Sequence, residues 1–292
     1  MTLRETVRSY LGLCKATISF FAALSAATGL LLANHSHGTA LPVLIMGVFL
    51  MACGACALNH YQERKTDGLM PRTADRPIPA GKIQPADALL FSLVLSGSGL
   101  AVLLSTGVWT APLLGLAAIL WYNGLYTWLK VRNAFAAIPG ALVGAIPPAI
   151  GWTMGGGHFD ARLAAICFFF FMWQVPHFLI HQQAFRKEYE EIHLPSLTTV
   201  FTGTQLDRLT FQWLLAAAVS LQLVLYYGLI QSSLIHLSLI ATSLWFITKG
   251  IALIKKRKPN YTDIFMSTNH FMLTAMLLIF ADRLPRCVGW MG

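Results

Sequence analysis

The sequence predicts an all-α, polytopic membrane protein with nine transmembrane helices. Three observations carry this prediction: composition, the length of the apolar segments, and the distribution of positive charge. Residues of the set AVILMFWYC make up 56% of the chain and charged residues only 11%, and mean hydropathy is +0.61. Soluble domains usually contain about 25% charged residues. This composition excludes soluble enzymes, disordered regulators and disulfide-rich secreted modules.

The expected spans are continuous apolar segments, because a bilayer requires about 20 apolar residues per helix. Ten-residue alternation typical of a transmembrane β-barrel is not the pattern here. Some segments contain Gly or Pro, which membrane helices tolerate when neighbours satisfy the backbone. In chain order the segments are roughly 17–34, 41–58, 86–105, 110–129, 136–154, 163–181, 211–229, 232–254 and 264–281. Together they predict one membrane-embedded domain covering residues 1–292.

Positive charge lies mainly on one side of these spans. Of the 21 Lys and Arg residues, 18 lie in the N-terminus and the loops after spans 2, 4, 6 and 8, and three lie on the other side. Cytoplasmic loops carry such an excess. We therefore expect a cytoplasmic N-terminus and an outside C-terminus, with the bacterial inner membrane as the location. The net charge of +9 is then explained by topology and the lipid bilayer, with no nucleic acid as partner.

Two large loops, about 59–85 and 182–210, are both expected on the cytoplasmic face. They hold seven of the chain's 12 acidic residues. In the first loop, Asn59, Glu63 and Asp67 recur every four residues and would share one helix face. Oxygen ligands of this kind suit Mg²⁺, which usually also binds waters or substrate phosphates. The alternative is a solvated helix end with Arg64 and Lys65 as charge partners.

A loop rich in Pro and Gly follows this stripe and contains Arg72 and Arg76. Arginine matches phosphate oxygens with a planar fork, so the order of carboxylates and arginines predicts a Mg²⁺-diphosphate site. Lys130 and Arg132, after span 4, are expected near the same face. The alternative for these basic residues is simple anchoring on the cytoplasmic side.

The second loop contains Glu188 and Glu191, which are three residues apart and would share a helix face. These carboxylates could hold a second cation opposite the first. A solvated amphipathic helix explains the spacing equally well.

Span 6 ends in polar and aromatic residues, among them Trp173, Gln174 and His177. Such polar side chains are costly in lipid and usually face the interior of the bundle. They are therefore candidates for lining a substrate pocket. The alternative for His177 is a hydrogen-bonded packing residue.

These blocks resemble, in order, the signatures of the UbiA superfamily of intramembrane prenyltransferases. The resemblance is specifically to its protoheme IX farnesyltransferase branch, also called heme O synthase. The matching residues are Asn59, Glu63 and Asp67; Met70, Arg72, Thr73, Arg76, Pro77, Ile78, Pro79 and Gly81; Tyr126 to Lys130; Gly144 to Trp152; Trp173, Gln174, Pro176, His177 and Phe178; and Tyr189, Leu194, Pro195 and Leu197.

The resemblance implies a nine-helix bundle around a central cavity that opens toward the cytoplasmic face. It also implies farnesyl diphosphate as donor, heme B as acceptor, Mg²⁺ as cofactor and heme O as product. The product would serve a terminal oxidase directly, or after a heme A synthase has acted on it. In this reading Asn59, Glu63, Asp67 and Glu188 are catalytic, and Tyr126 joins Trp173, Gln174 and His177 in the heme pocket. The metal ligands are Asn59, Glu63, Asp67, Glu188 and Glu191, and the diphosphate is bound by Arg72, Arg76, Lys130 and Arg132.

Two other functions stay open at this point. The same fold could prenylate an aromatic acid in quinone biosynthesis, and a nine-span bundle could be a non-catalytic heme or lipid transporter. The chain also departs from the family pattern at several positions. Glu63 and Glu188 stand where the family usually has Asp, and Lys15-Ala16-Thr17 stands where it usually has Lys-Pro-Arg.

Overall fold

The computed structural model describes residues 2–33, 40–255 and 259–287, and these residues form helices and turns without any strand. The all-α prediction is confirmed. The helices, with π- and 3-10 segments labelled η, are α1 (Leu3–Leu13), α2 (Ala16–Leu32), α3 (Ala40–Asp67), α4 (Pro85–Leu104), α5 (Thr110–Ile119), η1 (Leu120–Tyr126), α6 (Thr127–Lys130), η2 (Ala134–Ala136), α7 (Ala137–Gly140), η3 (Ala141–Ala145), α8 (Ile146–Met154), α9 (Ala161–Ala184), α10 (Arg186–Glu191), α11 (Leu197–Val200), α12 (Gly203–Tyr226), α13 (Ser233–Lys255) and α14 (Tyr261–Cys287).

The expected count of nine spans is approximate. In the described part of the chain, seven helical stretches are long and apolar enough to cross a membrane, or eight if the bent pair α1–α2 forms one span. The stretch expected at 110–129 is helical but divided into α5, η1 and α6. Its second half contains Tyr122, Asn123 and Tyr126, which dilute its apolar character. The polar residues that weaken it as a span are among those that contribute to the candidate site.

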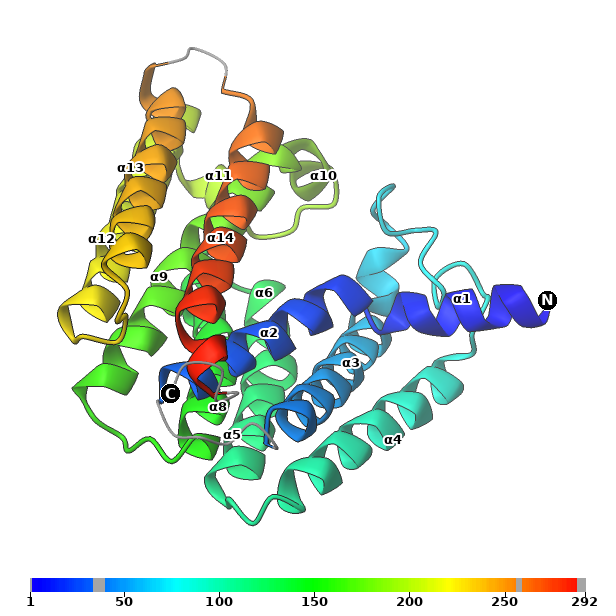
Figure 1. Ribbon diagram of the computed structural model, residues 1–292. Helices are drawn as coiled ribbons and strands as arrows, with labels where there is room; N and C mark the ends of the chain where they lie inside the picture. The colour runs from blue at the N-terminus through cyan, green and yellow to red at the C-terminus, as the bar shows by residue number, and fades with distance from the viewer. Residues whose placement is uncertain (1, 34–39, 256–258, 288–292) are drawn as a thin grey trace.

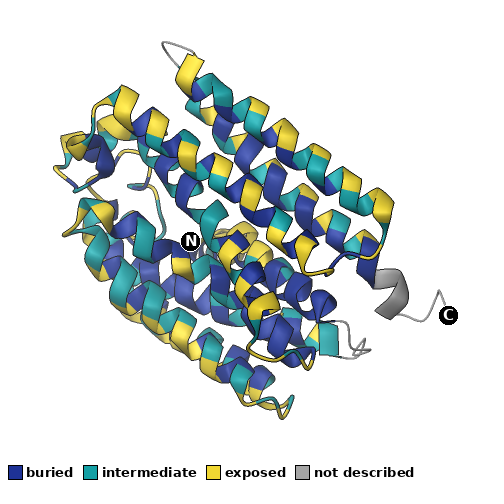
Figure 2. Ribbon diagram, turned by 90° about the vertical axis from the view of Figure 1, so that its left-hand side faces the viewer, coloured by how far each residue is buried: buried dark blue, intermediate teal, exposed yellow. Residues whose placement is uncertain are grey.

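The helices form one bundle in which α2 and α14 lie between two groups, α3 with α4 and α12 with α13 (Figure 1). Buried residues face the inside of this bundle and exposed residues run along its outer faces (Figure 2). Many of the exposed residues are large and apolar, such as Leu90, Leu120 and Leu234, which are 63%, 70% and 72% exposed. Lipid, rather than water, is the solvent that suits such an outer surface.

Helices α2 and α8 approach each other closely because of two glycines. A Cβ atom on Gly151 would lie 1.7 Å from the carbonyl oxygen of Ala26, and one on Gly29 would lie 2.0 Å from that of Pro148. Real Cβ atoms do not approach backbone this closely, so no other residue fits without moving a helix. Small residues allow such close backbone contacts between membrane helices.

Two breaks in the helices place charged residues. The axes of α1 and α2 differ by 46°, and Lys15 at their junction has a left-handed backbone with φ 44°. After α3, the chain folds back on the helix end, where the hydroxyl of Thr73 donates to the carbonyl oxygen of Asp67 at 2.8 Å. The buried side chains of Ile78 and Ile83 anchor this loop. Both breaks therefore direct basic residues toward the C-terminal end of α3.

Candidate active site

The stripe of oxygen-bearing side chains on α3 is buried. Asn59, Glu63 and Asp67 lie on successive turns of one helix face, and their exposed fractions are 2%, 6% and 4%. Buried carboxylates require charged or hydrogen-bonding partners. The structure thus rules out the solvated helix end that was the alternative for this stripe.

Each member of the stripe contacts one basic residue from another part of the chain. The ammonium of Lys15 donates to Oδ1 of Asn59 at 3.0 Å, and that of Lys130 lies 2.8 Å from Oε1 of Glu63. The Nη1 atom of Arg76 lies 2.8 Å from both carboxylate oxygens of Asp67. Three separate segments therefore bring cations to a single helix face.

The second large loop adds one more charge pair. Arg72 Nε lies 3.7 Å from Glu188 Oε2, and the Arg72 guanidinium lies over the Phe185 ring, 4.6 Å from its centroid. Glu188 Oε2 is a buried atom that has no hydrogen-bond partner among the described residues. Together the site contains three carboxylates and four cations, which leaves a net positive charge suited to a polyanionic ligand.

The π-helix η1 connects the acidic stripe to an aromatic region. Asn123 donates to the carbonyl oxygen of Ala55 and to Oε1 of Gln62, each at 3.0 Å. The hydroxyl of Thr127 accepts a hydrogen bond from Asn59 at 3.3 Å. Single-turn π segments are frequent at functional sites. Here the segment holds its polar residues against α3 so that Lys130 reaches Glu63.

Three stacked aromatic rings lead from η1 to α9. Tyr122 and Tyr126 stack with centroids 5.9 Å apart, and Tyr126 stacks on Phe178 at 5.6 Å with nearly parallel planes. Gly140 makes room for Tyr126, because a Cβ there would lie 2.3 Å from the ring. Since Tyr126 is four residues before Lys130, these rings begin one helical turn from the charged cluster.

A second aromatic group lies between α9 and α14. The His177 ring lies 5.0 Å from Trp173 and 4.7 Å from Phe265, measured between centroids. The indole N–H of Trp173 donates to the carbonyl oxygen of Thr268 at 2.8 Å, which fixes the wall of this group. Nδ1 of His177 is buried and has no hydrogen-bond partner among the described residues. An imidazole nitrogen in this condition is available to a ligand.

His181, one turn beyond His177, joins the two regions. Its ring lies 6.0 Å from Phe265 and 4.8 Å from Phe185. It is also close enough to Arg72 to interact electrostatically with that cation. Gln174, from the same helix, lies against Gly144, where a Cβ would come within 2.9 Å of its Oε1 atom.

Two residues predicted for the site lie outside the cluster. Arg132 is exposed, and its guanidinium donates to the carbonyl oxygen of Trp128 at 2.9 Å and covers that residue's ring. Glu191 is exposed on α10. The helix that carries it is only six residues long, and its face toward the bundle is used by the buried Tyr189.

Lys15 and Thr127 are site residues that the sequence did not single out. The signal for Lys15 was available, because it is a cation at the start of the first apolar segment. Its role depends on the left-handed backbone at residue 15, which has no sequence signature in a non-glycine residue. Thr127 lies in an aromatic segment where hydroxyl groups are commonly bonded to the helix backbone.

The donors suit a hard divalent cation bound together with a phosphate group. Among the described residues no group of three or more His, Cys, Asp and Glu side chains forms a ready metal cluster. Two carboxylates and one amide oxygen on a single face are instead a partial ligand set of the type Mg²⁺ completes with water and substrate phosphates. The basic partners of these side chains can then turn to the phosphate oxygens.

The UbiA prenyltransferase family matches residues 22–276 of the chain. Among curated proteins, a protoheme IX farnesyltransferase of Geobacter sulfurreducens is 40% identical over 200 residues, covering 68% of this chain and 73% of the relative. A protoheme IX farnesyltransferase of Oleidesulfovibrio alaskensis is 31% identical and covers 95% of this chain and 97% of its own.

Solved structures show the same fold at low sequence identity. A digeranylgeranylglyceryl phosphate synthase superimposes with a TM-score of 0.73 at 15% identity, over 96% of this chain and 99% of the other. A UbiA homologue from Archaeoglobus fulgidus, bound to GPP and Mg²⁺, has a TM-score of 0.64 at 15% identity and covers 93% and 99% of the two chains.

Proposed function

The chain belongs to the UbiA prenyltransferase family, and from this premise we propose that it transfers a farnesyl group from farnesyl diphosphate to a vinyl group of heme B. The products are heme O and diphosphate. The relatives named protoheme IX farnesyltransferase, which cover 68% and 95% of this chain, support this choice of donor and acceptor. The observation that carries it in the structure is the buried cluster of carboxylates and cations beside an aromatic group with a free imidazole nitrogen.

Donor binding is assigned to the charged cluster. Asn59, Glu63, Asp67 and Glu188 would hold Mg²⁺, which when bound neutralises diphosphate charge and stabilises the leaving group. Lys15, Lys130, Arg72 and Arg76 bind the remaining phosphate oxygens. In the structure each of these cations contacts one of the metal-binding side chains. Substrate binding therefore exchanges internal charge pairs for contacts with the diphosphate.

The transfer step breaks the bond between farnesyl C1 and the diphosphate oxygen, and both bonding electrons leave with the diphosphate. The allylic cation that results is stabilised by aromatic faces, and the stacked rings of Tyr122, Tyr126 and Phe178 are the nearest to the cluster. A vinyl carbon of heme then forms the new carbon–carbon bond to C1. Water adds to the other vinyl carbon and releases a proton, which completes the hydroxyethyl group. Rings on this side limit earlier attack by water.

Heme binding is assigned to the group between α9 and α14. His177 offers an unpartnered Nδ1 for the iron or for orienting the macrocycle, while Trp173 and Phe265 form flat walls. Tyr126, which stacks on Phe178 directly after His177, and Gln174, which lies against Gly144, are assigned to the same pocket. The product would pass to a terminal oxidase under assembly or to a heme A synthase, both of which require a hydroxyethylfarnesyl heme.

The direct test is incubation of the purified protein with Mg²⁺, farnesyl diphosphate and heme B, with detection of the product by mass. His177→Ala should lower heme turnover about tenfold or more, because it removes the imidazole, while the affinity for farnesyl diphosphate changes less than twofold. His158→Ala, at an exposed position, is the matched control. Prenylation of a hydroxybenzoate without any heme O would replace this proposal with an aromatic-acid acceptor, and no product with either acceptor would favour a transporter.

The orientation in the membrane has its own test. The charge distribution supports an arrangement with the N-terminus and both large loops in the cytoplasm and the C-terminus outside, and the proposed location is the bacterial inner membrane. A reporter fused after residue 292 that is active only outside the cytoplasm should give full signal. Signal only from a cytoplasmic reporter at this position would contradict the arrangement.

A further inference from the structure

Helix α1 extends beyond the bundle (Figure 1), and it carries an apolar stripe that none of the described residues covers. Leu3, Val7 and Leu11 lie four residues apart on one face and are 81%, 50% and 58% exposed. The helix is nevertheless well defined at its start. Thr2 and Glu5 form a capping box, in which the Thr2 hydroxyl accepts from the Glu5 N–H and the Glu5 carboxylate accepts from the Thr2 N–H.

The opposite face of α1 is fixed to the site end of the bundle. Ser9 and Leu13 are buried, and Leu13 packs with Ile78 and Ile83 of the first large loop. The helix therefore lies at the membrane face where α3 ends and α4 begins. Its bend of 46° from α2 tilts it away from the direction of the spanning helix.

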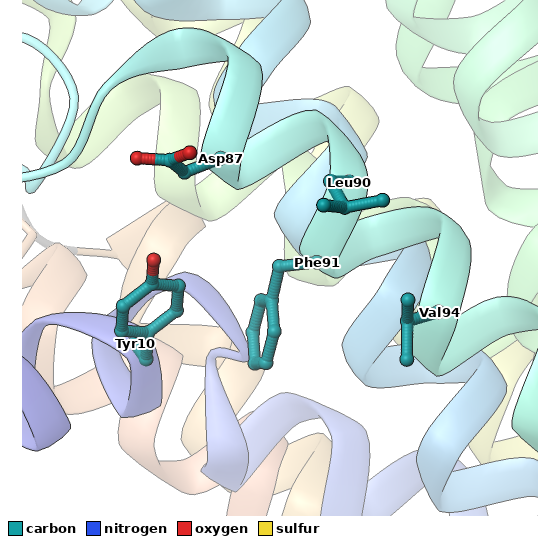
Figure 3. A pocket seen from close by; sticks show the side chains of 5 residues that line it. All are labelled: Tyr10, Asp87, Leu90, Phe91 and Val94. Atoms are coloured by element: carbon teal, nitrogen blue, oxygen red, sulfur yellow. The ribbon is translucent and has the colours of Figure 1, made fainter.

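A groove between α1 and α4 lies beside the apolar stripe and opens toward the outer surface of α4. It has a volume of about 410 Å³ and is lined by Tyr10, Asp87, Leu90, Phe91 and Val94 (Figure 3). The rings of Tyr10 and Phe91 meet edge to face at 4.9 Å and close one side. Leu90 and Val94, on the outer face of α4, are 63% and 56% exposed. The groove is thus continuous with the surface of α4 that faces lipid, and Asp87 marks its polar end.

Arginines flank the apolar stripe. Arg4 and Arg8 are exposed, and on a helix both fall along one edge of the stripe formed by Leu3, Val7 and Leu11. The one carboxylate of α1, Glu5, is used in the cap. A helix with an apolar face and adjacent basic residues lies in the interfacial plane of a membrane and favours anionic lipids.

We propose that α1 is an interfacial helix that binds anionic phospholipid. Leu3, Val7 and Leu11 enter the acyl region, Arg4 and Arg8 contact headgroup phosphates, and the groove between α1 and α4 takes an acyl chain. Lys15, directly after α1, donates to Asn59 in the charged cluster. Lipid binding at α1 therefore also fixes the position of a cation in the site.

The test is hydrogen exchange on the intact protein, one chain per lipid nanodisc, in phosphatidylcholine with and without phosphatidylglycerol. Each arginine near an anionic surface contributes about fivefold, so the amides of residues 4–11 should exchange about 25-fold more slowly with phosphatidylglycerol. Arg4→Gln with Arg8→Gln should abolish that difference. Lys187→Gln with Arg208→Gln removes the same charge from exposed positions away from α1 and should keep it.

A second pair of substitutions separates apolar insertion from charge. Leu3→Asn with Val7→Asn should speed exchange of α1 in both lipids. Equal exchange of wild-type α1 in both lipids would overturn the proposal. Protection of α1 that appears only when a second copy of the chain shares the nanodisc, or when another protein is added, would also overturn it. The apolar stripe would then be covered by a protein surface and not by lipid. Exchange is measured without substrate, so the outcome does not depend on the proposed reaction.

Discussion

The two large loops carry similar sets of charges, but their carboxylates lie at different depths. Glu63 and Asp67, at the start of the first loop, are 6% and 4% exposed and each lies 2.8 Å from a cation. In the second loop the Glu188 side chain is 22% exposed and lies 3.7 Å from its partner, and Glu191 is exposed. Sequence spacing identifies carboxylates that share a face, but packing decides which of them are removed from water.

The reason for the difference is the length of the helices that carry them. Glu63 and Asp67 end a 28-residue helix whose walls are covered by α2, α4 and η1. Glu188 and Glu191 belong to a helix of six residues with few neighbours. A charge pair in a buried setting is screened less and interacts more strongly. The first loop should therefore dominate activity, and the following substitutions test that ranking.

The largest effect is expected for Asp67→Asn. It removes a carboxylate that accepts two hydrogen bonds from Arg76 and is a proposed metal ligand. Heme O formation should fall on the order of 100-fold, and the Mg²⁺ concentration for half activity should rise. Asp75→Asn, at an exposed position of the same loop, is the control and should stay near wild type. Near-full turnover of Asp67→Asn would contradict the assigned role of the stripe.

Two substitutions of Glu63 distinguish the effect of its negative charge from the effect of its side-chain length. Glu63→Asp keeps the negative charge beside Lys130, so activity should fall only about fivefold. Glu63→Gln leaves the Lys130 ammonium without its ion-pair partner and should be about tenfold worse than Glu63→Asp. The comparison uses product formation under saturating Mg²⁺. Equal losses for the two variants would show that length, and not charge, matters at this position.

The second loop should respond more weakly. Glu188→Gln weakens a partly exposed pair with Arg72, so a loss of about fivefold is expected, mainly as a higher KM for farnesyl diphosphate. Glu191→Gln should change turnover by less than twofold, because exposed substitutions away from a site have small effects. A larger loss of activity for Glu191→Gln than for Glu188→Gln would contradict the expectation that the more buried carboxylate matters more. It would favour a second metal site that includes Glu191.

Much of the site could be predicted from short-range patterns. The stripe of Asn59, Glu63 and Asp67 follows from helical periodicity alone, and the Pro and Gly content of the next segment predicted a loop that carries Arg72 and Arg76. Arg132 could not be placed in the same way. It is two residues from Lys130, past the end of α6, where the chain turns outward and the guanidinium finds Trp128. A shift of two residues at a helix end changes the direction of a side chain completely.

The fold shows a similar limit. Apolar length predicted the helices well, but not the interruption of the fourth expected span by η1. Asn123 bonds to α3 and Tyr126 stacks on Phe178 of α9, and those partners are distant in sequence. The left-handed Lys15 depends likewise on contacts with α3. Local sequence does not specify such tertiary contacts. The central cavity implied by the family resemblance likewise depends on how distant helices pack, and it stays a prediction.

The glycine seam between α2 and α8 has a mechanical consequence. Gly29 and Gly151 leave no room for a methyl group, and Gly155 lies in the same seam, where a Cβ would meet Ala33 at 2.6 Å. Surfaces locked this tightly cannot slide past each other without separating, so α2 and α8 act as one rigid body.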